Sequence, residues 1–380
     1  MVVALESHSD TDLPHRGTRK AIHLEVANCN LKFAPWPPSV RTNVQIAAAI
    51  QRSMVESQNM KYTRLCLVTG FLMILSLGFV LTRGDAQPNT VKQIAPGVWF
   101  REGDIQHEGH CNNAIIEMKD YLIVVDANFP SGARAALADA KKVSPKPVKY
   151  VFDTHHHGDH SYGNAVWTQN GAITIAYTGV AEELKRYEPK RWQDTAKQRK
   201  DVAELKLDAP EPPKETFSDS PHVMTDGARR VEFRFFGWAH TRGDGFVYLP
   251  KEKVLCTGDA IVNGPYNYTA DGNIGNWPRV IAAAMKLNVE HVLPGHGGAG
   301  GKEVMAGQRA FMLELHEAVA RAIKAGKKLD DVVKSEGGRQ TTSIQLPDSV
   351  KNWVGPGLPS QVKDAFNEIT NKKPAGDLPH

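Results

Sequence analysis

The sequence is poor in cysteine and has no excess of charge of one sign. Four of its 380 residues are cysteines, and none of them stand in a CxxC or other zinc-ribbon spacing, which argues against a zinc ribbon. Lysine and arginine total 46 against 42 aspartates and glutamates, and the two signs are mixed along the chain. Because the sequence has no long basic block and no basic stripe interleaved with aromatics, a nucleic-acid partner is not expected. The charge balance favours a small molecule as the partner.

Two of the cysteines remain for the folded part of the chain. Cys66 lies in an apolar segment and Cys29 lies in front of it, whereas Cys111 and Cys256 belong to the later, strand-rich part. A disulfide between Cys111 and Cys256 is compatible with the sequence but is not predicted by it. Two separate buried thiols are the favoured interpretation.

Long apolar runs are also rare, and the one at residues 65–81 has the features of an export signal. It carries no charge, follows two basic residues and precedes the small residues Gly84 and Ala86. This order is typical of a secretory signal peptide, here residues 60–86. Because a membrane span needs about 20 apolar residues, an uncleaved anchor at 65–81 is the alternative. We therefore expect an exported protein, periplasmic or secreted, that contacts a membrane only through this segment if it stays uncleaved.

The residues before this segment lack any sustained hydrophobic period. Residues 1–59 mix His, Asp, Arg and Pro, a composition typical of disorder. Met60 stands directly before the basic flank of the apolar run, so a start at Met60 would give a well-proportioned signal peptide. We interpret residues 1–59 as a disordered extension or one that is not translated.

From about residue 90, short apolar strands alternate with helices. Strands are expected at 97–100, 113–118, 121–127, 148–154, 172–177, 229–236, 245–250, 253–259 and 290–295. Helices are expected at 131–143 with Ser131 as N-cap, at 178–206, at 276–287, at 302–326 and near 360–370. Two strand-rich blocks, each followed by helices, predict two sheets packed face to face with helices outside.

Residues 155–160 place four histidines and an aspartate directly after a strand that is expected to be buried. A glycine interrupts the run, which predicts a strand-to-helix loop instead of a helix. Alternate side chains of such a loop can converge on two points, His155 and His157 on one and Asp159 and His160 on the other. Imidazole with carboxylate suits zinc, and iron or manganese less exclusively. The run therefore predicts a metal site.

Four residues cannot complete two metal sites, and further candidate ligands follow other predicted strands. Each is polar, follows an apolar run and is bracketed by glycine: His240, Asp259 and His296. Taken singly, each would be an ordinary loop residue. Three of them at the ends of successive strands, together with the histidine run, predict one shared metal centre.

In order, these motifs resemble the signature of the metallo-β-lactamase superfamily: HxHxDH, a lone histidine, an aspartate in TGD and a histidine in PGH. The match spans roughly residues 92–300. The resemblance implies an α/β fold, a four-layer αββα sandwich of two mixed β-sheets packed face to face with helices on the outside. The hydrolase domain would then cover residues 90–335, and residues 336–380 would form a C-terminal tail with one helix.

The resemblance also implies a role for each ligand. His155, His157 and His240 would bind a first metal ion, Asp159, His160 and His296 a second, and Asp259 both. Two Zn²⁺ ions are the expected cofactors, with iron or manganese as alternatives. Two metals about 3.5–4 Å apart lower the pKa of a shared water, which then attacks a carbonyl as hydroxide. Asp159 is expected to orient that nucleophile and to pass a proton to the leaving group.

The expected activity is hydrolysis of an ester, lactone, thioester or amide in a small molecule, β-lactams included. Zinc β-lactamases with a cysteine on the second metal carry that cysteine where this chain has Asp259, and a lysine where it has Val262. A dedicated β-lactamase is therefore only an alternative. A second alternative is a metal-dependent redox member of the fold, such as a persulfide dioxygenase. Two zinc ions favour hydrolysis, whereas a single iron favours oxygen chemistry.

Two loops are expected to shape the substrate pocket. His107 and His110 stand in the loop before the second predicted strand, and Tyr266 and Tyr268 follow the TGD motif. Arg242 is the candidate for holding an anionic group of the substrate. For each of these residues an ordinary surface-loop role is the competing interpretation.

We expect the exported natural protein to begin near Gln87, because the signal segment would be removed after Ala86. Amino-terminal sequencing of the protein from its native host measures this directly. A mature chain that begins near Met1 would contradict our interpretation of residues 1–59.

Overall fold

The computed structural model describes residues 88–378. The predicted extension at 1–59 and the predicted signal segment at 60–86 lie outside the described residues. Within 88–378, no helix combines the length and the apolar character that a membrane crossing requires.

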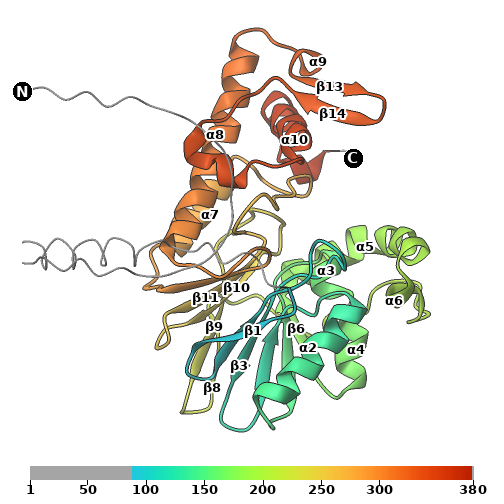
Figure 1. The fold of residues 1–380 in the computed structure, drawn as a ribbon, viewed down its shortest axis with the longest axis vertical. Helices are drawn as coiled ribbons and strands as arrows, with labels where there is room; N and C mark the ends of the chain where they lie inside the picture. Colours follow the sequence, from blue (N-terminus) through green and yellow to red (C-terminus); the bar gives the residue numbers. More distant parts are fainter. Residues whose placement is uncertain (1–87, 379–380) are drawn as a thin grey trace, which may run out of the picture. The chain divides into compact units, whose positions relative to one another are not determined.

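Two β-sheets form the centre of the domain (Figure 1). The first sheet has the order β1 (Val91–Ala95), β2 (Val98–Arg101), β3 (Asn113–Glu117), β4 (Leu122–Val125), β5 (Val148–Asp153), β6 (Ile173–Tyr177) and β7 (Glu215–Phe217). Its strands are antiparallel from β1 to β4 and parallel from β4 to β7. The second sheet has the order β12 (His291–Pro294), β11 (Val254–Gly258), β10 (Gly245–Leu249), β9 (Arg230–Phe235) and β8 (His222–Thr225). Only β11 and β12 pair in parallel there.

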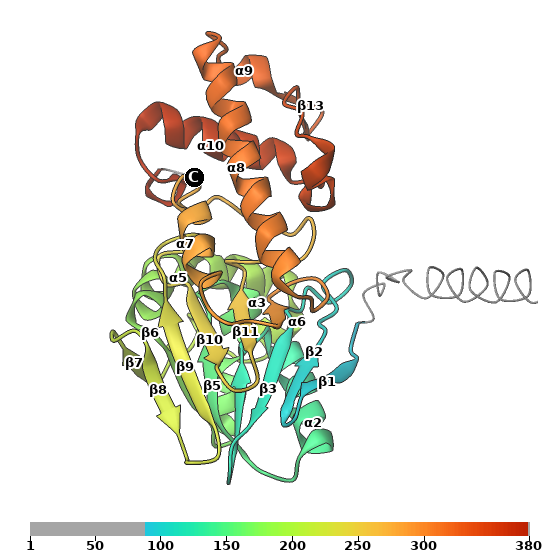
Figure 2. The same ribbon diagram turned by 90° about the vertical axis from the view of Figure 1, so that its left-hand side faces the viewer.

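Helices cover the outer face of each sheet. On the first sheet these are α2 (Pro130–Val143) and α4 (Asn164–Gln169), and on the second α7 (Trp277–Ala284) and the first turns of α8 (Lys302–Lys324). The connection from β5 to α4 carries α3 (Gly158–Ser161), and α5 (Thr178–Gln198) and α6 (Lys200–Ala203) follow β6. The remainder of α8 projects beyond the sheets (Figure 2). The predicted four-layer αββα sandwich is confirmed.

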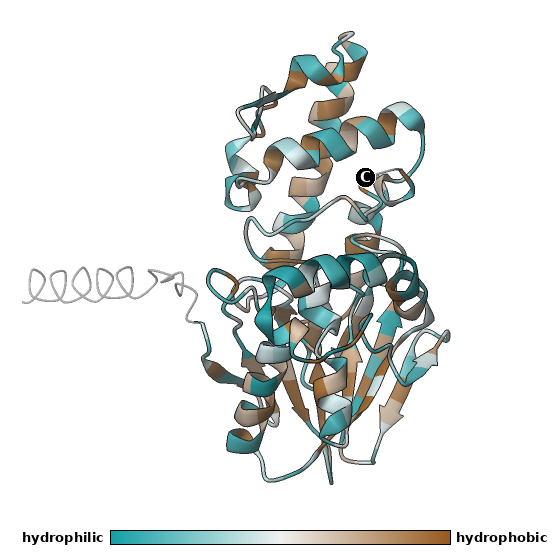
Figure 3. Cartoon of the chain, turned by 90° about the vertical axis from the view of Figure 1, so that its right-hand side faces the viewer, coloured by the Kyte–Doolittle hydropathy of each residue, from teal (hydrophilic) through white to brown (hydrophobic). Residues whose placement is uncertain are grey.

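Side-chain alternation along the strands explains the layers. In β4, Ile123 and Val125 face the core between the sheets, whereas Leu122 and Val124 pack under α2 and α4. A strand buried on both faces reads as a continuous apolar run, and in Figure 3 the central strands are accordingly brown. Cys111 and Cys256 are both buried and both free, as two separate thiols.

The start of α2 differs from the prediction. Phe129 holds the N-cap position, and the helix begins at Pro130 instead of after Ser131. Proline suits the first position of a helix because the N–H that it lacks would have no partner there. Ser131, the predicted N-cap, lies inside the helix, and its hydroxyl donates a hydrogen bond of 2.7 Å to Asp201, a residue in the first turn of α6.

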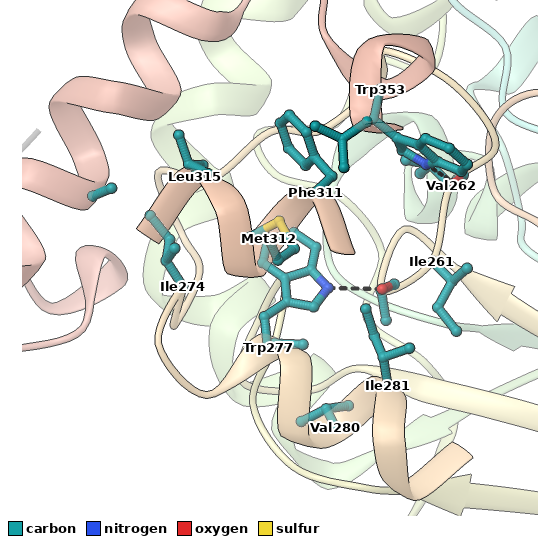
Figure 4. Close-up of a cluster of buried hydrophobic side chains, with 14 of the residues drawn as sticks. Ile261, Val262, Ile274, Trp277, Val280, Ile281, Phe311, Met312, Leu315 and Trp353 are labelled. Atoms are coloured by element: carbon teal, nitrogen blue, oxygen red, sulfur yellow. Dashed lines mark hydrogen bonds between the residues drawn. The ribbon is translucent and has the colours of Figure 1, made fainter. Parts of the chain in front are cut away.

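The C-terminal residues extend the helical layer on the second sheet. After α8 come α9 (Leu329–Val332), the hairpin β13 (Val333–Glu336) and β14 (Arg339–Thr342), the 3₁₀ helix η1 (Asp348–Trp353), α10 (Leu358–Asn371) and η2 (Ala375–Asp377). Residues 336–380, expected to be a tail with one helix, therefore also carry β14, η1 and η2. Figure 4 shows Trp353 packed near Phe311 of α8, with its indole N–H bonded to the Val262 carbonyl at 3.0 Å. The segment thus belongs to the same apolar core as α7 and α8.

We expect Phe311→Ala to lower the free energy of unfolding by about 3–5 kcal/mol, because it empties a fully buried position between α8 and the C-terminal elements. Urea unfolding followed by circular dichroism measures the change. Glu317→Ala on the exposed side of the same helix is the control and should change stability by no more than about 0.5 kcal/mol. Equal effects of the two variants would contradict a core that continues into the C-terminal segment.

Candidate metal centre

The seven predicted ligands lie at one edge of the sandwich, where strands of both sheets end. The histidine run follows β5, His240 lies between β9 and β10, Asp259 follows β11 and His296 follows β12. Two glycines let these loops approach closely. A Cβ on Gly258, whose φ is +49°, would lie 2.3 Å from the Thr154 hydroxyl, and one on Gly295 would lie 2.1 Å from Asp259 Oδ1. Larger residues at these two positions would force the strand ends apart.

His155, His157 and His240 turn one ring nitrogen each toward a common point. His157 Nδ1 lies 3.2 Å from His155 Nε2 and 2.9 Å from His240 Nε2. The remaining nitrogen of each ring has a fixed partner. His155 Nδ1 lies 3.1 Å from the Thr154 hydroxyl, and His240 Nδ1 lies 2.9 Å from the Tyr268 carbonyl oxygen. This arrangement fits a divalent cation, since such partners hold a ligand ring in one tautomer and orientation.

Asp159, His160 and His296 form a second group, whose ligand atoms lie within 4.8 Å of one another. His296 Nε2 lies 3.0 Å from Asp159 Oδ2. Asp259 lies between the two groups: its carboxylate is 3.4 Å from the Nε2 atoms of His160 and His296 and 3.9 Å from His240 Nε2. Among the described residues, buried Asp259 Oδ1 has no hydrogen-bond partner. A second cation fits this donor set and would satisfy that oxygen.

Burial and neighbouring charges shift the pKa values of the predicted ligands in both directions, and within the first group Asp271 raises the pKa of His157 against the effect of burial. Burial, assisted by His157, lowers the pKa of His240 to about 3, and the pKa of His155 also falls well below its ordinary value. For His296, burial opposes protonation, but Asp259 and Asp159 outweigh it and raise the pKa to about 9. Burial raises the pKa of Asp259, yet His296 and His160 lower it to about 2. Ionised carboxylates and neutral imidazoles are the forms that bind metal, so His296 would release its proton when an ion binds.

Asp126 follows β4 with a positive φ of +68° and holds the second group from behind. Its Oδ1 accepts hydrogen bonds from the Thr154 backbone N–H at 2.9 Å and from the Thr154 hydroxyl at 2.7 Å. Its Oδ2 lies 3.0 Å from His160 Nδ1. Asp126 therefore orients Thr154 and His160 from behind the candidate metal centre.

Asp271 is a site residue that the sequence analysis missed. Its fully buried carboxylate lies 2.7 Å from His157 Nε2 and accepts two hydrogen bonds from Arg191 of α5, at 2.6 and 2.9 Å. His156 faces the same carboxylate, with Nε2 3.4 Å from Asp271 Oδ2. Asp271 lies in a glycine- and asparagine-rich loop and follows no apolar run, so no local signal marks it.

A cleft of about 440 Å³ opens onto the ligands, and we refer to it as the metal cleft. Its lining includes His157, Asp159, Asp259, His296, Tyr266 and Tyr268. Tyr268 is 49% exposed, and its ring centroid lies 5.3 Å from that of His157. The two tyrosines proposed for substrate contact therefore stand beside the ligands.

The other three substrate candidates lie outside the lining of the metal cleft. The side chain of His107 is 78% exposed and pairs with Asp104, at 3.0 Å. His110 is buried, with Nε2 2.8 Å from the Ser131 hydroxyl. Arg242 pairs with Asp377 and lies over the Trp238 ring, so its charge is already compensated.

The αββα sandwich with a candidate metal centre at one edge supports the class of metal-dependent hydrolases. The sequence model of the metallo-beta-lactamase superfamily matches residues 108–296, and the chain belongs to this superfamily.

Among solved structures, the chain is similar to a metallo-beta-lactamase from Pontibacter korlensis at 21% identity and a TM-score of 0.49, over 59% of this chain and 98% of that one. It is also similar to the metallo-beta-lactamase FIM-1 from Pseudomonas aeruginosa, solved in a mono-zinc form, at 21% identity and a TM-score of 0.48, over 61% and 98%. A metallo-beta-lactamase from Hirschia baltica matches at 21% identity and a TM-score of 0.47, over 60% and 98%.

We expect Asp271→Asn to weaken zinc binding by about 10- to 100-fold, because the substitution removes the charged partner of His157 Nε2. Competition with a chromophoric chelator measures the zinc dissociation constants. Asp219→Asn is the control, because Asp219 also pairs with a histidine, His222 at 3.2 Å, but at the exposed surface. Zinc affinity that is equal in both variants and the parent protein would show that Asp271 does not position His157.

Proposed function

We propose that the protein is an exported dinuclear zinc hydrolase that cleaves an ester, lactone, thioester or amide bond in a small molecule. The observation that carries the proposal is the position of the Asp259 carboxylate, within 3.4–3.9 Å of histidines from both ligand groups. A carboxylate that reaches two sets of imidazoles supports a paired metal site. Export rests on the apolar segment at 65–81 and its flanks.

His155, His157 and His240 would hold one ion, Asp159, His160 and His296 the other, and Asp259 both. Bound there, the ions would lower the pKa of a water molecule and polarise the scissile carbonyl. The chain itself supplies orientation and proton transfer. Asp159 lines the metal cleft with its side chain 22% exposed, so its carboxylate can reach both a water and a leaving group.

The size and chemistry of the metal cleft support a small-molecule substrate. About 440 Å³ lies within the range of about 300–1,000 Å³ that is usual for ligand pockets. Tyr266 and Tyr268 offer apolar rings with hydroxyl groups at their tips, suited to a partly apolar substrate.

One position argues against the alternative of a dedicated β-lactamase of the cysteine-ligand type. Val262, at the position of the lysine that holds the substrate carboxylate in cysteine-ligand zinc β-lactamases, is fully buried in the core beneath α7 and α8. This residue cannot contact a substrate. Metal analysis distinguishes the proposed hydrolase from the alternative of a redox enzyme, because a single bound iron would support oxygen chemistry instead of hydrolysis.

We expect the zinc-loaded protein to hydrolyse members of a panel of lactones, thioesters, aryl esters and a chromogenic cephalosporin, and to lose this activity with chelator. Asp159→Ala should lower kcat by about 10²- to 10⁴-fold, as expected for an acid–base group. Asp194→Ala is the control, because Asp194 also lines the metal cleft but has no contact with the predicted ligands in the described part of the chain. Full turnover in Asp159→Ala would refute the role of that carboxylate, and chelator-resistant hydrolysis would refute the proposed function.

A further inference from the structure

A second cavity of about 520 Å³ adjoins the metal cleft, and we refer to it as the second lobe. It lies between the loop after β11 and the C-terminal elements, and α10 and the hairpin strand β14 contribute to its lining. The two cavities share two lining residues, Arg191 and Tyr268. Arg191 and Tyr268 therefore stand at the boundary between the metal cleft and the second lobe.

The short segment 266–269 lies between the two cavities, and successive residues of it line one cavity or the other. Tyr266 lines only the metal cleft, Asn267 lines only the second lobe, and Tyr268 lines both. Thr269 continues the lining of the second lobe, where its hydroxyl donates a 2.6 Å hydrogen bond to Asp364. The backbone of this segment also contacts the first ligand group, because the Tyr268 carbonyl oxygen lies 2.9 Å from His240 Nδ1. The two cavities thus share wall residues and one supporting backbone segment.

The polar face of α10 forms the opposite wall. Ser360, Asp364 and Asn367 recur at a helical spacing and line the second lobe, whereas Val362 and Phe366 are buried in the apolar core. The amphipathic pattern of α10 thus sets part of its polar surface toward the cavity, and Ser360 remains exposed to solvent as well.

The chemistry of the second lobe favours a neutral, hydrogen-bonding ligand. Its lining holds four carboxamides and two aliphatic hydroxyls: Asn267, Gln340, Gln361, Asn367, Thr269 and Ser360. The guanidinium of Arg191 is compensated by Asp271 and Glu188, and the lining also holds one charge of each sign, Lys363 and Asp364. Carboxamides both donate and accept, which suits groups that do the same, namely hydroxyls and amides.

Two buried amides at the inner wall have unused hydrogen-bonding capacity. Gln361 is 3% exposed and donates through Nε2 to the Asn267 carbonyl oxygen at 2.6 Å, while its Oε1 has no partner within residues 88–378. Asn267 Nδ2 is likewise unpaired there. Both atoms are buried within the inner wall, so they make the wall polar behind the residues that contact the cavity.

We propose that the second lobe binds a neutral, hydroxyl- or amide-bearing part of the substrate, while the scissile carbonyl lies in the metal cleft. This inference rests on the proposed hydrolase function. An O-acetyl ester of N-acetylglucosamine illustrates the chemistry. Water adds its oxygen to the acetyl carbon, the bond from that carbon to the sugar oxygen breaks, and the sugar oxygen takes a proton, which yields acetate and the free sugar.

Binding is tested without catalysis by ligand-observed NMR titration of the zinc-loaded protein with N-acetylglucosamine and, separately, with N-acetylglycinamide. Asn367→Leu removes a hydrogen-bond donor and an acceptor from the lining. Gln340→Leu does the same at an exposed position, where a substitution has little effect on folding. Asn371→Leu is the matched control, one turn further along α10 and outside the lining. Thermal melting of all three variants verifies that they fold.

We expect saturable binding that weakens about fivefold or more in Asn367→Leu and Gln340→Leu and is unchanged in Asn371→Leu. Binding of the sugar assigns a hydroxyl-rich group, and binding of the amide alone assigns a peptide-like group. Binding of neither compound, or equal binding by all variants, overturns the inference.

A kinetic comparison distinguishes this inference from the proposed function. Hydrolysis of 4-nitrophenyl acetate, which has no extension to reach the second lobe, should be unaffected by Asn367→Leu, whereas KM for the O-acetylated sugar should rise about fivefold. If neither ester is hydrolysed but binding depends on Asn367, the proposed function fails and the second lobe stands. If both esters are hydrolysed and Asn367→Leu leaves KM for the O-acetylated sugar unchanged, the proposed function stands and the inference about the second lobe fails.

Discussion

The convergence of strand ends from two face-to-face sheets is the constraint on which the site depends. β5 belongs to the first sheet, β9, β11 and β12 belong to the second, and the loops that follow them carry all seven predicted ligands. The apolar layer between the sheets sets how close these loops come. Imidazoles and carboxylates crowded into a buried edge would be costly without compensation, because each loses its contacts with water. Opposite charge within the cluster and partners behind each ring, such as Asp126 behind His160, offset part of that cost.

Helix α5 is connected to the site through one buried carboxylate. Arg191 of α5 holds Asp271 with two hydrogen bonds, and Asp271 holds His157. A helix that the sequence presents as a charged outer element thus helps to orient a predicted metal ligand. Displacement of α5 would be transmitted to His157 through this chain of contacts. The same arginine also borders both cavities, so ligand orientation and cleft shape depend on one side chain.

The C-terminal elements connect stability with the shape of the site. Trp353 and Phe311 pack in the apolar core that covers the second sheet, and they attach the C-terminal elements to it. This packing holds α10 in place. With α10 fixed, part of its polar face becomes a wall of the second lobe. The helical layer therefore stabilises the sandwich and, through the loop that carries Tyr268, encloses the space beside the predicted ligands.

The sequence by itself determined the elements with strong local signals. The apolar runs predicted the sheets, the helical period predicted 302–326 for a helix observed at Lys302–Lys324, and the spacing HxHxDH identified a candidate metal centre. Tertiary structure alone decided the role of Asp271, which lies 114 residues from His157 and 80 from Arg191 in the chain. It also decided that His107, His110 and Arg242 lie away from the metal cleft and that Tyr268 borders two cavities. Periodicity and motif spacing report contacts between near neighbours in the chain, whereas the partner of a buried charge is selected by how distant segments pack.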